Sequence, residues 1–210
     1  GAEISALMLS KEKLVHSSLW GGDLEAFIFQ GSARGLFRKK DVLFSVADTS
    51  VYRLGKKAPF GSILGARGPY GIFAAGVDTP LNNWFRKVYI DRYSVPPVGG
   101  SYQAAQGVLA AKYAYDAAAK ANGGKFPNKD QVIAALEGAT YQGIAAPVHM
   151  NRSNGHQAAT KHMIGVLQWD KEAGEPIMTK VTEFGPDCVM PPPGVNGTEW
   201  LKGGMKGAKC

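Results

Sequence analysis

Residues 14–23 read LVHSSLWGGD, an apolar strand that ends in a tryptophan and a pair of glycines. Asp23 is then the predicted N-cap of a helix from Leu24 to Arg34, which Gly35 is expected to end. Helices that alternate with buried strands predict an α/β layer built on a parallel sheet. The pattern places helices over 3–11, 24–34 and a short stretch after the turn at 47–50, and strands over 14–18, 42–46 and 61–66.

The middle of the chain is predicted to be helical. Thr79 and Pro80, with Asp78 before them, are typical of a helix start, and this helix should reach Tyr93. Ser101 is the predicted cap of a long alanine-rich helix that ends at Asn122, before two glycines. A third helix is expected over 128–137.

The last third of the chain favours strands. Apolar strands are expected at 147–150 and 163–169, and the polar segment between them carries Asn154-Gly155, a tight-turn signal. This arrangement predicts a β-hairpin. A further strand candidate spans 177–184, and the proline- and glycine-rich end is predicted to be a surface tail.

Composition and motifs exclude several classes of protein. Hydrophobic residues make up 45% and charged residues 20%, which is ordinary for a globular protein, and no apolar run of membrane-spanning length is present. The chain has 24 Lys and Arg against 17 Asp and Glu, a net charge of +7, but its cations are scattered, so no nucleic-acid partner is predicted. No nucleophile elbow, P-loop, dinucleotide fingerprint or catalytic-cysteine signature occurs, so neither enzymatic activity nor a cofactor is predicted.

Histidines and cysteines are the candidate metal ligands. His149, His156 and His162 lack the helical spacing of a metal-binding pair, and no metal site is predicted. Cys188 and Cys210 are not in a C-x-x-C pair. In an oxidising compartment they could form a disulfide that closes a loop of about 22 residues, while the alternative is two unrelated thiols.

Four segments, taken in order, resemble the Leu/Ile/Val-binding family of periplasmic receptors. The similarity covers about residues 3 to 185, and the order of the segments carries it, because no single one is specific. The segments are Val15–Asp23, the strand that leads into Gly65–Tyr70, Asn83–Tyr89 followed by a Ser-Tyr-Gln-Ala-Ala helix at Ser101, and the hairpin that ends in Gly165–Trp169.

The resemblance implies a type I periplasmic-binding-protein fold, in which two α/β lobes are joined by three crossing strands and hold a ligand between them. On that basis residues 1–68 form an α/β segment of the second lobe, and residues 69–143 form a helical segment that belongs to the first lobe. Residues 144–185 would be the hinge return, near Ile144 to Val148, with the C-terminal β-hairpin of the second lobe. Residues 186–210 would be the tail.

The family's N-terminal half has no counterpart in this sequence, so the resemblance implies an incomplete two-lobed fold. The helices of the middle segment would then have apolar faces without a sheet to cover. The expected partner is the missing N-terminal half as a separate chain, or a second copy of this chain, unless the middle repacks.

Ligands of open α/β sheets bind beyond the carboxyl ends of the strands, which selects two candidate positions. Ser18 and Trp20 follow the first strand, and the resemblance implies an aromatic near Trp20 that packs on the ligand, with core packing as the alternative. Asp48 and Thr49 follow the second strand. The resemblance implies a carboxylate near Asp48 that faces a ligand ammonium, whereas a simple helix N-cap would also explain Asp48.

Three further candidates lie near the expected hinge and the long helix. Arg67 could pair with a ligand carboxylate or be a solvated surface arginine. Tyr70 lies at the hinge, where Gly68 and Gly71 allow the backbone to change, and Tyr102 starts the helix that faces the cleft.

The predicted function is therefore the solute-binding component of an ABC importer. It would be exported to the periplasm, would bind an amino acid or an aromatic or aliphatic acid by hinge closure, and would deliver it to a membrane permease. The alternative is a ligand-sensing receptor or regulator domain of the same fold. An α/β hydrolase is a weaker alternative, because no nucleophile elbow is found.

Overall fold

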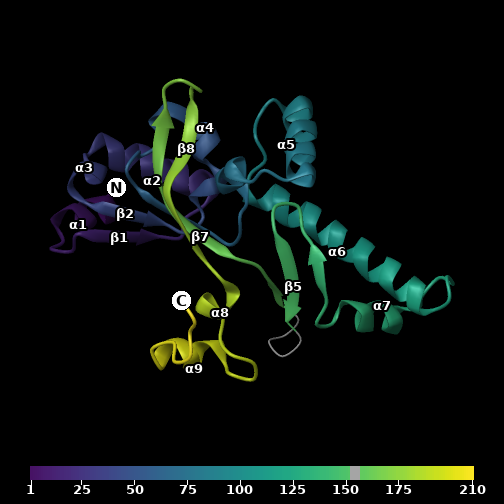
Figure 1. Cartoon of the computed structure of the whole chain (residues 1–210). Coiled ribbons are helices and arrows are strands. Elements are labelled where there is room, and N and C mark those ends of the chain that lie inside the picture. Colours follow the sequence, from purple (N-terminus) through teal and green to yellow (C-terminus); the bar gives the residue numbers. More distant parts are fainter. Residues whose placement is uncertain (152–156) are drawn as a thin grey trace.

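The computed structural model describes residues 1–151 and 157–210 and places two α/β units side by side (Figure 1). The first unit is built on a five-stranded sheet, sheet A, with strand order β1-β2-β3-β7-β8. The strands β1 to β3 are parallel, and β7 and β8 join them as an antiparallel hairpin. The bounds are β1 Leu14–Ser17, β2 Asp41–Phe44, β3 Ile63–Ala66, β7 His162–Asp170 and β8 Glu175–Phe184.

Helices cover one face of sheet A because alternate strand residues are apolar on that side. Phe44 and Leu64 face the core and are fully buried, and the helix α2 contributes Leu24 and Ile28, one turn apart. Each such side chain stabilises the fold by about 1.5–3 kcal/mol. The covering elements are α1 Ala2–Leu9, α2 Gly21–Ala33, α3 Leu36–Lys39, α4 Val51–Leu54 and the 3₁₀ turns η1 Ala47–Thr49 and η2 Gly55–Lys57.

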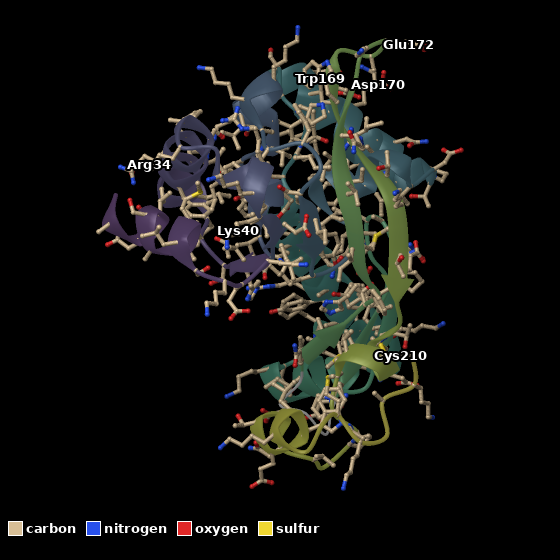
Figure 2. The ribbon with its side chains drawn as sticks, turned by 90° about the vertical axis from the view of Figure 1, so that its left-hand side faces the viewer. Arg34, Lys40, Trp169, Asp170, Glu172 and Cys210 are labelled. Atoms are coloured by element: carbon tan, nitrogen blue, oxygen red, sulfur yellow. A yellow bond between two sulfur atoms is a disulfide. The ribbon has the colours of Figure 1, made fainter. Side chains whose placement is uncertain are left out.

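Polar contacts hold peripheral elements at both edges of sheet A (Figure 2). At the β1 edge Arg34 donates to the carbonyl of Gly1, and Lys40 donates to the carbonyl of Ser10 at 2.7 Å, so α1 is held against α2 and α3. At the β7–β8 edge the tip of the hairpin contacts η2, where Lys56 Nζ lies 5.6 Å from the ring centroid of Trp169.

The predicted cap of α2 is wrong by a few residues. The helix begins at Gly21 with Trp20 as its N-cap residue, and Asp23 lies in its first turn. Gly21 has a φ of +57°, a left-handed conformation that glycine adopts readily. The helix therefore begins at Gly21, three residues before the start that an Asp23 cap predicts. Asp23 still favours the helix, because a carboxylate in the first turn complements the helix dipole.

The second unit combines helices with a small sheet, sheet B. It comprises the 3₁₀ segment η3 Gly71–Gly76, the helices α5 Pro80–Tyr93, α6 Gly99–Ala121 and α7 Lys129–Leu136, and the strands β4 Thr140–Gln142, β5 Pro147–Asn151 and β6 Gln157–Ala159. In Figure 1 the helix α6 extends away from the first unit, with sheet B on one side of it and α5 on the other. A separate core forms here around Tyr70, Tyr102 and Ile144.

Local signals set the ends of two of these helices. Thr79 Oγ1 accepts from the backbone N–H of Asn82 at 3.2 Å, and Pro80 occupies the first turn of α5 as predicted. Asn128 and Gln131 form a capping box at the start of α7. The predicted Ser101 cap of α6 is wrong, because the helix begins at Gly99, which a side chain from the first unit caps.

Strand pairing in the last third differs from the predicted hairpin. The strand β5 pairs with β6, and β7 pairs with β3 and β8, so 147–150 and 163–169 are not partners. The predicted Asn154-Gly155 turn lies outside the described residues. The reason lies in β7, because Met163 and Leu167 are buried in the core of sheet A. Pairing with β3 therefore buries more apolar surface of β7 than pairing with β5 would.

The return from the second unit to the first also lies later in the chain than expected. The predicted crossing, Ile144 to Val148, forms instead the turn from β4 and the start of β5, and its Ile144 and Ala145 are buried against α6. The chain passes back at Thr160 and Lys161, between β6 and β7.

The C-terminal tail is folded. A disulfide joins Cys188 in α8 (Pro186–Val189) to Cys210. Trp200 in α9 (Gly197–Lys202) is buried and donates its indole N–H to the carbonyl of Lys206 at 2.9 Å. Both helices lie at the end of the molecule opposite the tip of the β7–β8 hairpin (Figure 1).

Candidate ligand-binding site

A cavity of about 410 Å³ lies where the carboxyl ends of β1, β2 and β3 meet the N-terminus of α6. Both units contribute to its wall, and it is open to solvent on one side. Its lining consists of Ser18, Trp20, Ser45, Val46, Asp48, Thr49, Ala66, Arg67, Tyr70, Gly99, Gly100 and Gln103. Three parallel strands that end at one edge place their following loops together, which is why residues far apart in sequence meet here.

Six of the seven predicted site residues line this cavity, and Tyr102 does not. Tyr102 is fully buried, its hydroxyl donates to Asn82 Oδ1 at 2.8 Å, and its ring stacks on Tyr70. Successive residues of a helix are rotated by about 100°, so α6 turns Gln103 to the cavity and Tyr102 to the core.

Asp48 is a buried carboxylate that links the two units. Its Oδ2 accepts from the backbone N–H of Gly99, the first residue of α6, at 2.9 Å. Two glycines make room for it, since a Cβ would lie 2.3 Å from Oδ2 at Gly99 and 2.7 Å at Gly71. The alternative prediction for Asp48 was a helix N-cap. Asp48 does cap a helix, but that helix is α6 and not the one that directly follows Asp48 in sequence.

Burial and hydrogen bonding act on Asp48 in opposite directions. Desolvation raises the pKa of its carboxyl, and the backbone N–H of Gly99, with the Arg67 cation, lowers that pKa in part. Burial dominates and leaves the pKa at about 6.

Arg67 and Tyr70 lie on the segment that leaves β3. Arg67 is exposed and lines the cavity, whereas Tyr70 is buried and donates its hydroxyl to Gln106 Oε1 at 2.8 Å. Burial raises the pKa of Tyr70, so its hydroxyl stays protonated as a donor. Gly68 between them has a φ of +149°, and a Cβ there would lie 2.3 Å from the Tyr70 ring.

Trp20 forms the outer wall. It follows β1 and is 71% exposed, so its ring is available to a ligand. Ser18 also lines the cavity on this side. Ser45 follows β2, and its Oγ lies 2.6 Å from His16 Nε2. The cavity thus combines an aromatic surface, hydroxyl groups, one exposed cation and one buried carboxylate.

Sequence reasoning missed half of the lining. Ala66 directly precedes the selected Arg67, while Val46 and Ser45 lie two and three residues before the selected Asp48, so extending each selection back to the end of its strand would have found them. Gly99, Gly100 and Gln103 come from the start of α6. Their signal is the glycine pair directly before Ser101, which the predicted cap at Ser101 left outside the helix.

A second polar contact joins the units behind the cavity. The guanidinium of Arg86 in α5 interacts electrostatically with the side chains of Tyr52 in α4 and Tyr102 in α6, and its Nη1 is buried without a hydrogen-bond partner among the described residues. Burial raises the pKa of Tyr52, although the Arg86 cation lowers it in part. Arg86 and Asp48 therefore connect the same two units at separate points.

Neither a metal-binding cluster nor a membrane-spanning helix is found among residues 1–151 and 157–210. No group of three His, Cys, Asp or Glu side chains there is arranged to hold a metal ion. His149 contacts Thr140 at 3.0 Å, and His156 lies outside the described residues. No helix in the same part of the chain is long and apolar enough to cross a membrane.

Solved structures with the same fold are bacterial transport proteins. A solute-binding protein of an ABC transporter from Rhodopseudomonas palustris, in complex with 3,4-dihydroxybenzoic acid, is 18% identical with a TM-score of 0.70 over 88% of this chain and 48% of that one. A Leu-, Ile-, Val-, Thr- and Ala-binding protein from Brucella ovis is 18% identical, with a TM-score of 0.66 over 91% and 48%. A leucine-binding protein from Thermotoga maritima is 15% identical, with a TM-score of 0.64 over 89% and 48%.

The chain spans about half the length of these solved structures. No curated protein matches its sequence. A family model described as periplasmic binding protein matches residues 1–175. Because that match covers most of the 210 residues, the chain belongs to the periplasmic binding protein family.

Proposed function

We propose that this chain forms part of the solute-binding component of an ABC importer and holds a small carboxylate-bearing ligand in the cavity between its two units. The family is one of binding proteins and not of enzymes. The observation that carries the proposal is the lining of the cavity, to which loops after three parallel strands and the start of α6 contribute from opposite sides. Such a site can enclose a small ligand when the units approach each other.

Each lining group has a part in this proposal. Arg67 pairs with the ligand carboxylate, because a guanidinium forms charge-assisted hydrogen bonds with a carboxylate. Trp20 packs against the apolar body of the ligand, and the hydroxyls of Ser18 and Thr49 supply further hydrogen bonds. Tyr70 is held in the cavity wall by the hydrogen bond that its hydroxyl donates to Gln106.

Closure is proposed to occur about the two segments that connect the units. The first contains Gly68 and Gly71, whose φ values of +149° and +57° are accessible to glycine and strained for other residues. The second is Thr160–Lys161. In this proposal the unit with sheet A and the unit with α5 to α7 are the two lobes, and hinge motion narrows the cavity around the ligand.

Two apolar surfaces support a further protein partner. On α5, Trp84 is 59% and Val88 46% exposed, one turn apart. On the face of sheet A away from α1 to α3, Leu14 and Ile164 are exposed. We propose that a second segment covers these surfaces, either the N-terminal half of the same protein or a second copy of this chain, because exposed large apolar side chains on one face of a helix or sheet are typical of interaction sites.

A periplasmic location and a permease partner complete the proposal. The Cys188–Cys210 disulfide is stable in an oxidising compartment, which the periplasm provides. A closed, loaded receptor would then dock on the membrane permease of the importer.

A thermal-shift screen of amino acids, aromatic acids, aliphatic acids and amides against the full-length protein tests the proposed function. A ligand at about 100 times its dissociation constant stabilises a protein by about 2.7 kcal/mol. For a protein of this size that raises the unfolding temperature by about 5–10 °C. The absence of a shift with every small acid would contradict the proposal.

A further inference from the structure

We propose that the cavity selects a carboxylate that carries no α-ammonium group, with Asp48 as the residue that positions helix α6. This inference rests on the proposed binding function and names the ligand class of that same site. It follows from what Asp48 already binds, from the charges that line the cavity, and from the space around the carboxylate.

Asp48 is already engaged within the protein. Its Oδ2 accepts from the N–H of Gly99 at 2.9 Å, and the backbone N–H groups of Asp48 and Thr49 favour the charged form of the carboxylate electrostatically. Only 7% of the residue is exposed. A ligand ammonium would bring three further donors, each of which must find an acceptor when buried.

The space around Asp48 points the same way. Its Oδ2 lies between Gly71 and Gly99. A Cβ added to Gly71 would lie 2.7 Å from Oδ2, and one added to Gly99 would lie 2.3 Å from it. An ammonium group is at least as large as a methyl group. On the side of Oδ2 that faces these two glycines, it would fit only if the start of α6 moved away, and that movement would break the bond to Gly99.

The remaining charge in the lining is positive. Asp48 and Arg67 are the charged residues among those that line the cavity, and Asp48 is buried and bonded to the N–H of Gly99. Arg67 is exposed and can turn to a ligand. The first turn of α6 adds the partial positive charge of a helix N-terminus on the same side. A carboxylate is stabilised by Arg67 and this helix N-terminus, whereas an ammonium is repelled by both and meets a carboxylate that is already bonded to Gly99.

Matched ligand pairs that differ only in the amine test the inference. Calorimetric titration of the full-length protein at pH 7.5 would compare 4-methylpentanoate with leucine and 3-phenylpropanoate with phenylalanine. The amine-free member of at least one pair should bind about tenfold tighter or more, the factor expected for one unsatisfied buried polar group.

The outcomes separate this inference from the function on which it rests. Equal or tighter binding of the amino acid in every pair that binds would overturn the inference and leave the binding function standing. Failure of all four compounds, together with a negative thermal-shift screen, would overturn the binding function and the inference with it.

Variants of Asp48 distinguish its positioning role from contact with the ligand. Asp48→Ala should weaken binding of the amine-free acid, because α6 loses its cap, and Asp48→Asn should recover much of that loss, since its amide oxygen can accept from Gly99. An ammonium partner would behave differently, because asparagine lacks the negative charge and would not rescue it. If Asn and Ala weaken binding equally in folded protein, the positioning role is wrong.

Arg67→Gln provides the second arm and leaves the α6 cap intact. It should weaken binding of the acid by about 10- to 100-fold, as expected for loss of a charge-assisted hydrogen bond. Arg92→Gln, at an exposed arginine at the end of α5 and outside the lining, is the matched control. Equal effects of the two substitutions would contradict a direct contact between Arg67 and the carboxylate.

Discussion

At the scale of single residues, the contact between Asp48 and Gly99 has most influence on the site. A carboxylate from the 3₁₀ turn η1 completes the first turn of α6, so the position of the cavity wall depends on one hydrogen bond between residues 51 apart in sequence. Glycine at position 99 is required by space, because Asp48 occupies the volume where a side chain would begin.

Gly99→Ala should therefore destabilise the protein and weaken ligand binding together. The added methyl group would push the Asp48 carboxylate away from the helix, and overpacking of this kind costs about 1–3 kcal/mol. Thermal unfolding and calorimetric titration would measure the two effects.

Gly107→Ala is the matched control for this substitution. It lies on the same helix, and a Cβ there meets no atom within 4 Å. Alanine should raise helix stability at this position by up to about 1 kcal/mol. If both substitutions have the same effect, the proximity of Asp48 is not the reason that position 99 needs glycine.

At the scale of elements, the contrast between strand positions and strand partners is the clearest lesson. The strands at 14–17, 41–44 and 63–66 lie where apolar runs indicated, because the burial of alternate residues is a local pattern. The partner of β7 was not predictable in this way. Two strands near in sequence were expected to pair, yet β7 is inserted beside β3, almost a hundred residues earlier.

The C-terminal element offers a direct test of what holds it together. Replacing Cys188 and Cys210 by serine should loosen residues 186–210, because the disulfide closes a loop whose constraint contributes roughly 3 kcal/mol in the chain-entropy model. Hydrogen exchange should show loss of protection around Trp200 with sheet A unaffected. A reducing agent should reproduce this in the native protein and change nothing further in the double variant, and equal protection in all samples would contradict the prediction.

At the scale of the whole molecule, two units with separate cores share one cavity. The first core centres on Phe44 and Leu64, and the second on Tyr70 and Tyr102. Asp48 and Arg86 are polar contacts between the units, which suits parts that move relative to each other more than a continuous apolar interface would. Each unit leaves one apolar surface exposed, on α5 in one unit and on the open face of sheet A in the other.

These surfaces should drive association of the 210-residue chain when it is produced alone. Sedimentation velocity should detect oligomers, and Trp84→Lys with Val88→Lys should shift the distribution towards monomer, because charged residues oppose burial of the α5 surface. Leu201→Lys, at a position 62% exposed on α9, is the control and should have little effect. A monomeric chain with no dependence on Trp84 and Val88 would remove the support for a covering segment.

Much of the candidate site was accessible from sequence, for a physical reason. Loops that follow parallel strands converge at one edge of a sheet, so Trp20, Asp48 and Arg67 could be selected from strand positions alone. Tyr102 was misplaced because its direction depends on the rotation of α6 about its axis. That rotation follows from the true start of the helix, which Asp48 sets from the other unit.

The amino-acid order was sufficient to place the helices at 2–9, 21–33, 80–93, 99–121 and 129–136 and the three parallel strands, because caps, alternation and apolar spacing act over a few neighbouring residues. The kind of protein followed from the resemblance of four ordered segments to a known family, and α8 and α9 were not predicted. Tertiary structure decided the pairing of β7, the beginning of α6 and the partner of Asp48. Each of these depends on which distant residues compete for the same buried space or hydrogen bond, and that competition is resolved only when the whole chain is packed.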